Sequence, residues 1–264
     1  MKLLIKYVKL NLKRLSQQPT YLALFLLAPL AVYIAGLLCV TVFFPIELID
    51  AAQYYLITSI VFSILLNSYL YLARNMSNDK KQHFDIVLKN NKKYFIFNLS
   101  YIVVYGLLVL ASSILLFILS FIYGGLIWSV LRYIALLLFA FIGALVFACF
   151  GICASLIPRK FFSLVGYIVL FIAFLSGVFI PLSAFTGGTA PVLEIIPIYN
   201  LSNIGWQFIY SRIYSEIDFV FLGLWSLGFL SIASIFYPQP PEYTVDKKSV
   251  SGKNMSDKNK TDRN

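Results

Sequence analysis

Charge and histidine are both scarce in this sequence. Only 12% of its residues are charged and one histidine, His83, is present, against 60% hydrophobic residues. Because soluble domains carry about 25% charged residues, the composition excludes an ordinary soluble domain and indicates a membrane protein. The three cysteines, Cys39, Cys149 and Cys153, lie in apolar runs, whereas His83 lies in a polar segment, which argues against a His/Cys metal site.

Motifs for catalysis and for energy coupling are missing as well. Ion-coupled transporters usually bind their ion through carboxylates deep in the membrane. Here the carboxylates near the apolar runs fall at or beyond the expected ends of spans: Glu47, Asp50, Glu194, Glu216 and Asp218. Metal-dependent membrane proteases need His/Glu clusters, and ATPases need a GxxxxGK[ST] loop that the sequence lacks. We therefore expect no enzymatic activity and no cofactor on this chain.

Long apolar runs dominate what is present. Each reaches the roughly 20 residues that cross a bilayer as a helix, which predicts an all-α, polytopic membrane protein with six transmembrane helices in one domain, residues 19–237. A segment between the last two spans, interrupted by glycine and proline, predicts re-entrant or interfacial helices. Residues 238–264 are predicted to be a disordered cytoplasmic tail. The expected spans are 21–44, 52–73, 94–123, 128–157, 161–180 and 219–237.

Residues 1–18 predict an amphipathic interfacial helix. Lys2, Lys6, Lys9 and Lys13 fall on one helical stripe, while leucine, isoleucine and valine cover much of the other side. Such a helix lies on a lipid surface, and it can also contact a cytoplasmic partner.

Basic residues are distributed unequally between the two sides of the predicted bundle. Of the 21 Lys and Arg residues, only Arg132 and Arg212 fall on the side away from the N-terminus. The positive-inside rule therefore predicts that both termini are cytoplasmic, in a cell membrane that we expect to be a bacterial plasma membrane. The net charge of +10 then faces anionic membrane lipids, and no nucleic-acid partner is needed to explain it.

Residues 74–93, RNMSNDKKQHFDIVLKNNKK, form a long charged stretch between apolar runs. We predict that this cytoplasmic coupling loop receives force from a separate ATPase subunit, with Phe84 and Leu88 as apolar contacts four residues apart. A solvated loop that rests on anionic lipid is the alternative. The candidate ATPase-coupling residues are Asp79, Lys80, Lys81, Phe84, Asp85 and Leu88.

Two further faces are marked by residue spacing. Ser59, Ser63, Asn67 and Tyr71 follow one another at four-residue steps on the second span, so they share a face that should avoid lipid. This face either makes hydrogen bonds between helices or lines a cargo pathway or the seam of a permease dimer. A small-residue face on the fourth span predicts close packing with another helix: Ala140, Ala144, Ala148, Gly151 and Ser155.

The order of these features resembles the type-2 permease family of ATP-binding-cassette transporters, most of whose members are exporters. A basic helix precedes the first span, a cytoplasmic loop separates spans two and three, and a broken apolar segment separates spans five and six. SGVFIPLSAF and PVLEIIPIYNLSNI, at 176–185 and 191–204, look like the family's SG-x-x-x-P … P … I-x-x-x-P pattern. The resemblance covers residues 1–237. Residues 90–93, NNKK, stand where the family's coupling segment has proline and glycine.

The resemblance implies a half-transporter. Two permeases, a second copy or a paralogue, would pair with two ATP-binding-cassette ATPase subunits that bind ATP and Mg. The apolar spans, in a chain with 24 Phe and 18 Tyr, predict an amphipathic or hydrophobic cargo such as an antimicrobial peptide, a drug or a lipid-linked molecule. One alternative is a non-transporting immunity or assembly protein that binds a partner through its cytoplasmic loop. The other is a membrane enzyme acting on lipids, which the missing polar cluster disfavours.

Overall fold

The computed structural model describes residues 2–43, 48–81, 91–126, 128–175, 179, 195–210 and 216–236. All regular secondary structure in these ranges is helical. The elements are α1 (Lys2–Ser16), α2 (Pro19–Phe43), α3 (Leu48–Leu66), the π-helical segment η1 (Asn67–Ala73), α4 (Arg74–Lys81), α6 (Asn91–Gly124), α7 (Val130–Ala154), α8 (Arg159–Leu175), α10 (Pro197–Tyr210) and α11 (Glu216–Phe236).

Within the described ranges, five helices are long and apolar enough to cross a membrane. These stretches are Pro19–Val40, Ile49–Asp79, Phe95–Tyr123, Val130–Ala154 and Glu216–Ile235. Helix α8 is apolar over the shorter stretch Lys160–Phe174. The all-α prediction is therefore confirmed. The predicted fifth span, 161–180, and with it the total of six, stays a prediction, because most of the residues between 176 and 194 lie outside the described residues.

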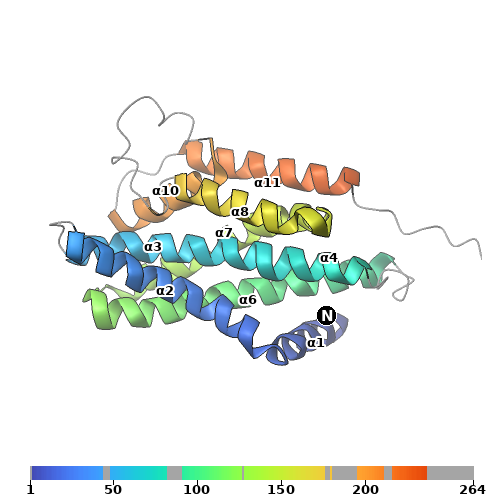
Figure 1. Cartoon of the computed structure of the whole chain (residues 1–264), viewed down its shortest axis with the longest axis horizontal. Helices are drawn as coiled ribbons and strands as arrows, with labels where there is room; N and C mark the ends of the chain where they lie inside the picture. Colours follow the sequence, from blue (N-terminus) through green and yellow to red (C-terminus); the bar gives the residue numbers. More distant parts are fainter. Residues whose placement is uncertain are drawn as a thin grey trace, which may run out of the picture.

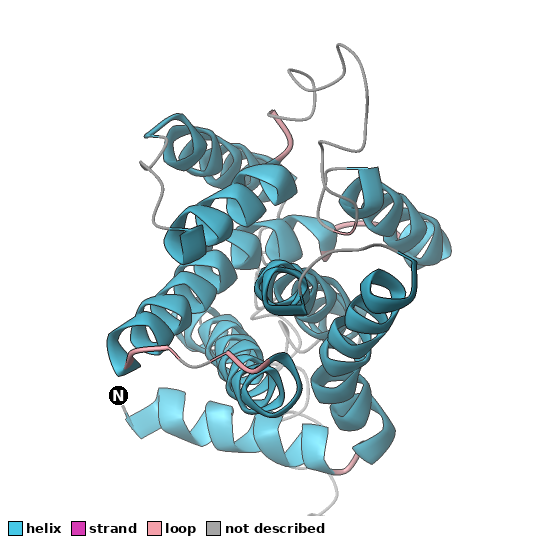
Figure 2. Cartoon of the chain, turned by 90° about the vertical axis from the view of Figure 1, so that its left-hand side faces the viewer, coloured by secondary structure: helices cyan, strands magenta, loops and turns pink. Residues whose placement is uncertain are grey.

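The long helices lie side by side along one axis, and successive ones run in opposite directions (Figure 1). The N-terminus, α4 and the last turn of α11 lie at one end of this bundle, which we call the α4 end, and α10 lies at the other, the α10 end. Figure 2 looks along the bundle and shows α1, beside the N label, lying across its axis. The residues predicted to be an interfacial helix thus form a helix set crosswise to the spans.

Proline and glycine set the helix boundaries as their backbone chemistry predicts. Helix α1 ends at Ser16 and α2 begins at Pro19, where the missing proline N–H costs no helical hydrogen bond. Helix α6 ends at Gly124, and Gly125 follows with a φ of 61°. Glycine reaches this left-handed conformation without the clash that a Cβ atom causes. This boundary agrees with the end of the predicted third span, 94–123.

The second span forms the centre of the bundle. In its most apolar window 83% of the residues are buried, against 17% to 44% in the other candidate spans. Helix α7 packs closely on it through the predicted small-residue face, where a Cβ atom on Gly151 would stand 2.8 Å from the backbone oxygen of Ser68. Ala140, Ala144 and Ala148 on the same face are buried. The prediction of a close helix contact at this face is confirmed.

Helices α8 and α11 expose many large apolar side chains. Large side chains on both are exposed, including Tyr167 and Phe171 on α8 and Ile217, Leu227 and Ile235 on α11. Soluble monomers rarely expose contiguous apolar patches above a few hundred Å². Surfaces of this kind suit lipid, which agrees with the membrane character of the sequence.

Candidate functional site

The crosswise helix α1 is fastened to the bundle by its apolar side. The Tyr7 ring meets the Phe97 ring edge-to-face at a centroid distance of 5.3 Å. One turn along, Asn11 Nδ2 donates a 2.8 Å hydrogen bond to Ser100 Oγ, and Leu15 is buried. These contacts place the end of α1, with Arg14, over the start of α6 and beside α4.

Arg14, Asp79 and Tyr101 join three helices at the α4 end. Arg14 Nη1 lies 3.4 Å from Asp79 Oδ2 and donates a 3.1 Å hydrogen bond to the Tyr101 hydroxyl. The Tyr101 hydroxyl in turn donates to the same carboxylate oxygen. The Asp79 side chain is only 13% exposed. Burial disfavours a lone carboxylate, so a cation and a hydroxyl that both address one oxygen are what allow Asp79 to lie there. We call this triad the junction.

The π-helical segment η1 is supported by side chains from inside and outside its own helix. A π turn disturbs the backbone ladder and leaves carbonyl groups of the preceding turn in need of donors. Asn67 Nδ2 reaches the backbone oxygen of Ser63 at 2.9 Å, and Ser68 Oγ reaches that of Leu65 at 2.9 Å. From α6, the Tyr105 hydroxyl donates to the backbone oxygen of Ile64 at 3.1 Å. Tertiary contacts thus hold the unusual turn at the point where the span approaches the junction.

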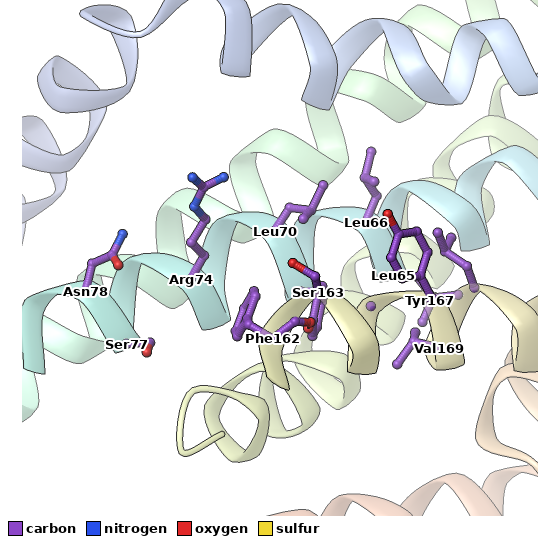
Figure 3. A pocket seen from close by; sticks show the side chains of 13 residues that line it. Leu65, Leu66, Leu70, Arg74, Ser77, Asn78, Phe162, Ser163, Tyr167 and Val169 are labelled. Carbon is purple, nitrogen blue, oxygen red and sulfur yellow. The ribbon is translucent and has the colours of Figure 1, made fainter. Parts of the chain in front are cut away.

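Two cavities flank η1 and α4. The first, which we call the α1 cavity, has a volume of ≈ 420 Å³ and is largely polar; its lining includes Asn11, Arg14, Tyr71, Arg74 and Asp79. The second, the α8 cavity, has a volume of ≈ 430 Å³ and lies between η1 and α8 (Figure 3). Its lining is mostly apolar and includes Leu65, Tyr69, Phe162, Val169 and Leu170, with Ser77 and Asn78 near one end.

A ridge on the central helix separates the two cavities. Leu70, Arg74 and Asn78 line both of them and follow at four-residue steps, so they lie on one helical face. The Arg74 guanidinium stands 4.8 Å from the centroid of the Tyr21 ring, and Figure 3 shows it pointing away from Phe162. In this structure the Arg74 guanidinium therefore lies on the α1-cavity side of the ridge.

Two of the buried polar atoms that lack a hydrogen-bond partner among the described residues belong to the lining of the α1 cavity, beside its charged groups. Asn11 and Tyr71 are 1% and 2% exposed. Nevertheless, Asn11 Oδ1 and the Tyr71 hydroxyl have no hydrogen-bond partner among the described residues. Buried polar groups are nearly always hydrogen-bonded. One atom is an acceptor and the other is able to donate, and both residues belong to the lining of the α1 cavity.

The predicted coupling residues are only partly described. Asp79 belongs to the junction. Lys80 and Lys81 form the last positions of α4, but their side chains are not among those described, and Phe84, Asp85 and Leu88 lie outside the described residues. The polar segment 74–93 begins as helix α4 and ends in the first turn of α6. Its first part is thus a direct helical extension of the second span.

The predicted polar stripe is enclosed within the single chain. Ser59, Ser63, Asn67 and Tyr71 are all buried. Ser63 Oγ lies 2.5 Å from Ser112 Oγ on α6 and accepts a 3.2 Å hydrogen bond from Asn67 Nδ2. Tyr71 instead lines the α1 cavity. Ser63 and Asn67 therefore belong to an interhelical contact and Tyr71 is a cavity residue at the α4 end, whereas Ser59 Oγ is buried without a hydrogen-bond partner among the described residues.

Arg14, Tyr101 and Asn11 are site residues that the sequence did not reveal. Arg14 reads as one more basic residue of an amphipathic helix, and Tyr101 as one of many aromatic residues in a span. Asn11 did carry a signal, since it falls among Val8 and Leu15 on the apolar side of the helix. A polar side chain on an apolar face predicts a specific hydrogen bond inside the bundle.

The fold defines this chain as a multi-pass helical protein of the membrane type. Its five apolar helices have the length and composition of membrane spans, and within the described residues no group of His, Cys, Asp and Glu side chains could hold a metal ion. Comparisons with family models, with curated proteins and with solved structures found no match to this chain.

Proposed function

We propose that this chain is the transmembrane permease subunit of an ATP-binding-cassette exporter. In this proposal it has six spans with both termini in the cytoplasm, and it works in the plasma membrane with a second permease copy or a paralogue. A separate ATPase subunit, which binds ATP and Mg, drives it. The cargo is amphipathic or hydrophobic.

The observation that carries the proposal is the connection between the polar segment and the core. Helices α3, η1 and α4 follow one another without a break from Leu48 to Lys81, which at 1.5 Å per residue makes a rod about 50 Å long. Its last turns are tied to α1 and α6 by the junction. A force on residues 82–90 would therefore move three helices together. For ATP to use this connection, its binding must favour one permease state over the other.

The α8 cavity supports the cargo class. Its leucine, valine and aromatic lining suits an apolar body, and Ser77 and Asn78 offer polar contacts toward the α4 end. Helix α8 is held there by the Tyr69 ring, which stacks on Phe162 at 4.5 Å, and by the Tyr69 hydroxyl, which donates to the Phe162 backbone oxygen. A displacement of α8 would widen the cavity without breaking the central contact of α3 with α6.

The decisive experiment identifies the proteins that copurify with the chain. The tagged full-length protein is extracted from its native membrane in mild detergent, and bound proteins are identified by mass spectrometry. An ATP-binding-cassette ATPase is expected at one copy per permease. After reconstitution, Asp79→Leu should lower cargo-stimulated ATP hydrolysis on the order of tenfold if the junction transmits force. Arg132→Gln, a charge removal at the start of α7, is the matched control and should leave the hydrolysis rate unchanged.

A different outcome would favour the alternative function. If the active chain copurifies with no nucleotide hydrolase and instead retains one soluble or membrane partner, it is a non-transporting immunity or assembly protein. If an ATPase copurifies but Asp79→Leu and Arg132→Gln hydrolyse ATP at the same cargo-stimulated rate, the junction does not transmit force and the coupling role of Asp79 is wrong.

A further inference from the structure

We propose that the α1 cavity binds the headgroup of a monoanionic phospholipid that carries a hydroxyl group, with Arg74 as the phosphate contact. This site lies on the other side of the Leu70–Arg74–Asn78 ridge from the α8 cavity, and the inference does not depend on the transport proposal. It rests on the chemistry of the cavity lining and on the position of the cavity beside the crosswise helix.

The balance of charge in the α1 cavity favours an anion. Arg14 and Arg74 are cations and Asp79 is an anion, so the charged lining carries a net positive charge. Asp79 is engaged by Arg14 and Tyr101 in the junction. Within the described residues, Arg14–Asp79 is the ion pair recorded, and Arg74 contacts the face of Tyr21. A phosphate oxygen can therefore approach Arg74 without breaking the junction, and charged hydrogen bonds of this kind are the strong ones.

The unsatisfied atoms specify more than a phosphate. The Tyr71 hydroxyl can donate to a phosphate oxygen, whereas Asn11 Oδ1 accepts only, because Asn11 Nδ2 already faces Ser100. Because the acceptor Asn11 Oδ1 and the cation Arg74 line the same cavity, the ligand that fits best carries a hydrogen-bond donor near its phosphate. A phosphoglycerol headgroup supplies a phosphate with one negative charge and hydroxyl groups that can donate to Asn11 Oδ1. Choline offers no hydroxyl or N–H donor, and its zwitterion leaves the net charge of the site unmatched.

The surroundings of the cavity suggest a lipid as the source of this phosphate. The cavity is bounded by α1, whose lysines form a basic stripe, and basic amphipathic helices favour anionic membrane surfaces. The apolar α8 cavity lies on the other side of the Leu70–Arg74–Asn78 ridge. A headgroup at Arg74 thus sits next to apolar protein surface, as the headgroup of a membrane lipid does.

The test measures lipid binding to the full-length chain in neutral detergent. Short-chain phosphatidylglycerol and phosphatidylcholine are titrated separately, and bound lipid is counted by native mass spectrometry. Phosphatidylglycerol should bind at least tenfold more tightly, and Arg74→Gln should weaken its binding on the order of tenfold, as the loss of a charged hydrogen bond does. Arg132→Gln removes the same charge elsewhere and leaves the lysine stripe of α1 intact, so it should not change the affinity.

Tyr71→Phe separates binding from folding. The variant keeps the edge-to-face contact of the ring with Phe25 at 5.8 Å and removes a hydroxyl that has no partner within the described residues. Without lipid its melting temperature should equal or exceed that of the wild type, while the affinity for phosphatidylglycerol should fall a few-fold. A purely structural hydroxyl would give the opposite pattern.

Three results would overturn the assignment. Equal affinity for the two lipids would contradict the selection of an anionic headgroup. Equal affinity of Arg74→Gln and Arg132→Gln for phosphatidylglycerol would show that Arg74 does not contact the phosphate. Inorganic phosphate or glycerol phosphate that displaces phosphatidylglycerol at comparable concentration would identify a soluble phosphate as the ligand in place of a lipid.

Discussion

Asp218 at one end of the bundle and Asp79 at the other are carboxylates largely shielded from solvent, and the described residues around them differ. At the α10 end, Asp218 Oδ2 accepts hydrogen bonds from Asn203 Nδ2 at 2.8 Å and from Gln207 Nε2 at 3.0 Å. At the α4 end, Asp79 is held by a cation and a hydroxyl from two other helices, beside a cavity. Asp218 lines neither of the two cavities described above.

This difference separates a structural cluster from a candidate binding site. Hydrogen bonds from Asn203 and Gln207 to the Asp218 carboxylate tie α10 to the first turn of α11, away from the two cavities. The α1 cavity combines spare donors and acceptors with charge, so a ligand can complete its hydrogen bonding. A binding role for polar residues near a membrane surface is therefore indicated by hydrogen-bonding atoms that lack a partner beside a charged cavity, rather than by the number of polar residues.

The largest effect on stability is expected where the central span meets α7. A Cβ atom on Gly151 would stand 2.8 Å from the Ser68 backbone oxygen in η1, and backbone cannot move aside as a side chain can. Gly151→Val should lower the free energy of unfolding by about 3 kcal/mol, the upper range for overpacking. Unfolding in mixed micelles, followed by tryptophan fluorescence, measures it.

Gly106→Val on α6 is the matched control, because an added Cβ atom there meets nothing within 4 Å. It introduces the same change of helix propensity without the clash. If the two variants lose the same stability, the close approach of α7 to η1 is wrong. A loss of phosphatidylglycerol binding in Gly151→Val alone would show that η1 also shapes the α1 cavity.

Removal of the Asp218 carboxylate should have the next largest effect. Asp218→Ala leaves the amide groups of Asn203 and Gln207 without this acceptor, which should cost about 2 kcal/mol of unfolding free energy. Asp218→Asn retains a side-chain oxygen and should cost less. The same micelle unfolding assay measures both variants. Comparable losses of stability in the two variants would contradict the role of Asp218 as an acceptor for the two amides. A change in phosphatidylglycerol binding in either variant would contradict the assignment of Asp218 to a purely structural cluster.

The Arg14–Asp79 pair should contribute a smaller coupling energy. Its N–O distance is 3.4 Å and the Arg14 side chain is 36% exposed, so water screens the attraction. A double-mutant cycle with Arg14→Gln and Asp79→Asn should give about 1 kcal/mol, near the top of the range for exposed pairs. A coupling energy near zero would mean that Tyr101 alone holds Asp79. Neither outcome alters the Asp218 cluster.

The sequence predicted the helices of this fold better than it predicted the site. Hydropathy adds up along the chain, so apolar runs and the boundaries at Pro19 and Gly124 could be read directly. The Arg14–Asp79 contact could not, because its partners are far apart in sequence and meet only when α1 lies across the bundle. Similarly, η1 depends on Tyr105 from another helix. The helical form of residues 74–81 was missed because their composition is polar, whereas Asn75 Nδ2 stabilises this helix by donating to the Tyr71 backbone oxygen at 2.8 Å.

The smallest effect is expected from a chain of side-chain hydrogen bonds within the bundle, formed by Ser112, Ser63 and Asn67. Ser112 Oγ donates to the Val109 backbone oxygen at 2.9 Å. Because each hydroxyl has one proton, Ser63 must then be the donor in its 2.5 Å contact with Ser112, and Asn67 Nδ2 donates to Ser63 Oγ at 3.2 Å. The hydrogen bonds therefore run in one direction, from the Asn67 amide to Ser63, from Ser63 to Ser112 and from Ser112 to the Val109 backbone oxygen.

A double-mutant cycle with Ser63→Ala and Ser112→Ala should give about 0.6 kcal/mol, the average for hydrogen bonds between membrane helices. Both single variants should be less stable than the wild type in micelle unfolding, whereas Tyr71→Phe, which removes a hydroxyl with no partner among the described residues, should lose no stability. Ser63 and Tyr71 belong to one predicted stripe, whereas Ser112 is the partner of Ser63 on α6. If all three variants lost the same stability, the division of that stripe into a structural contact and a cavity residue would be wrong.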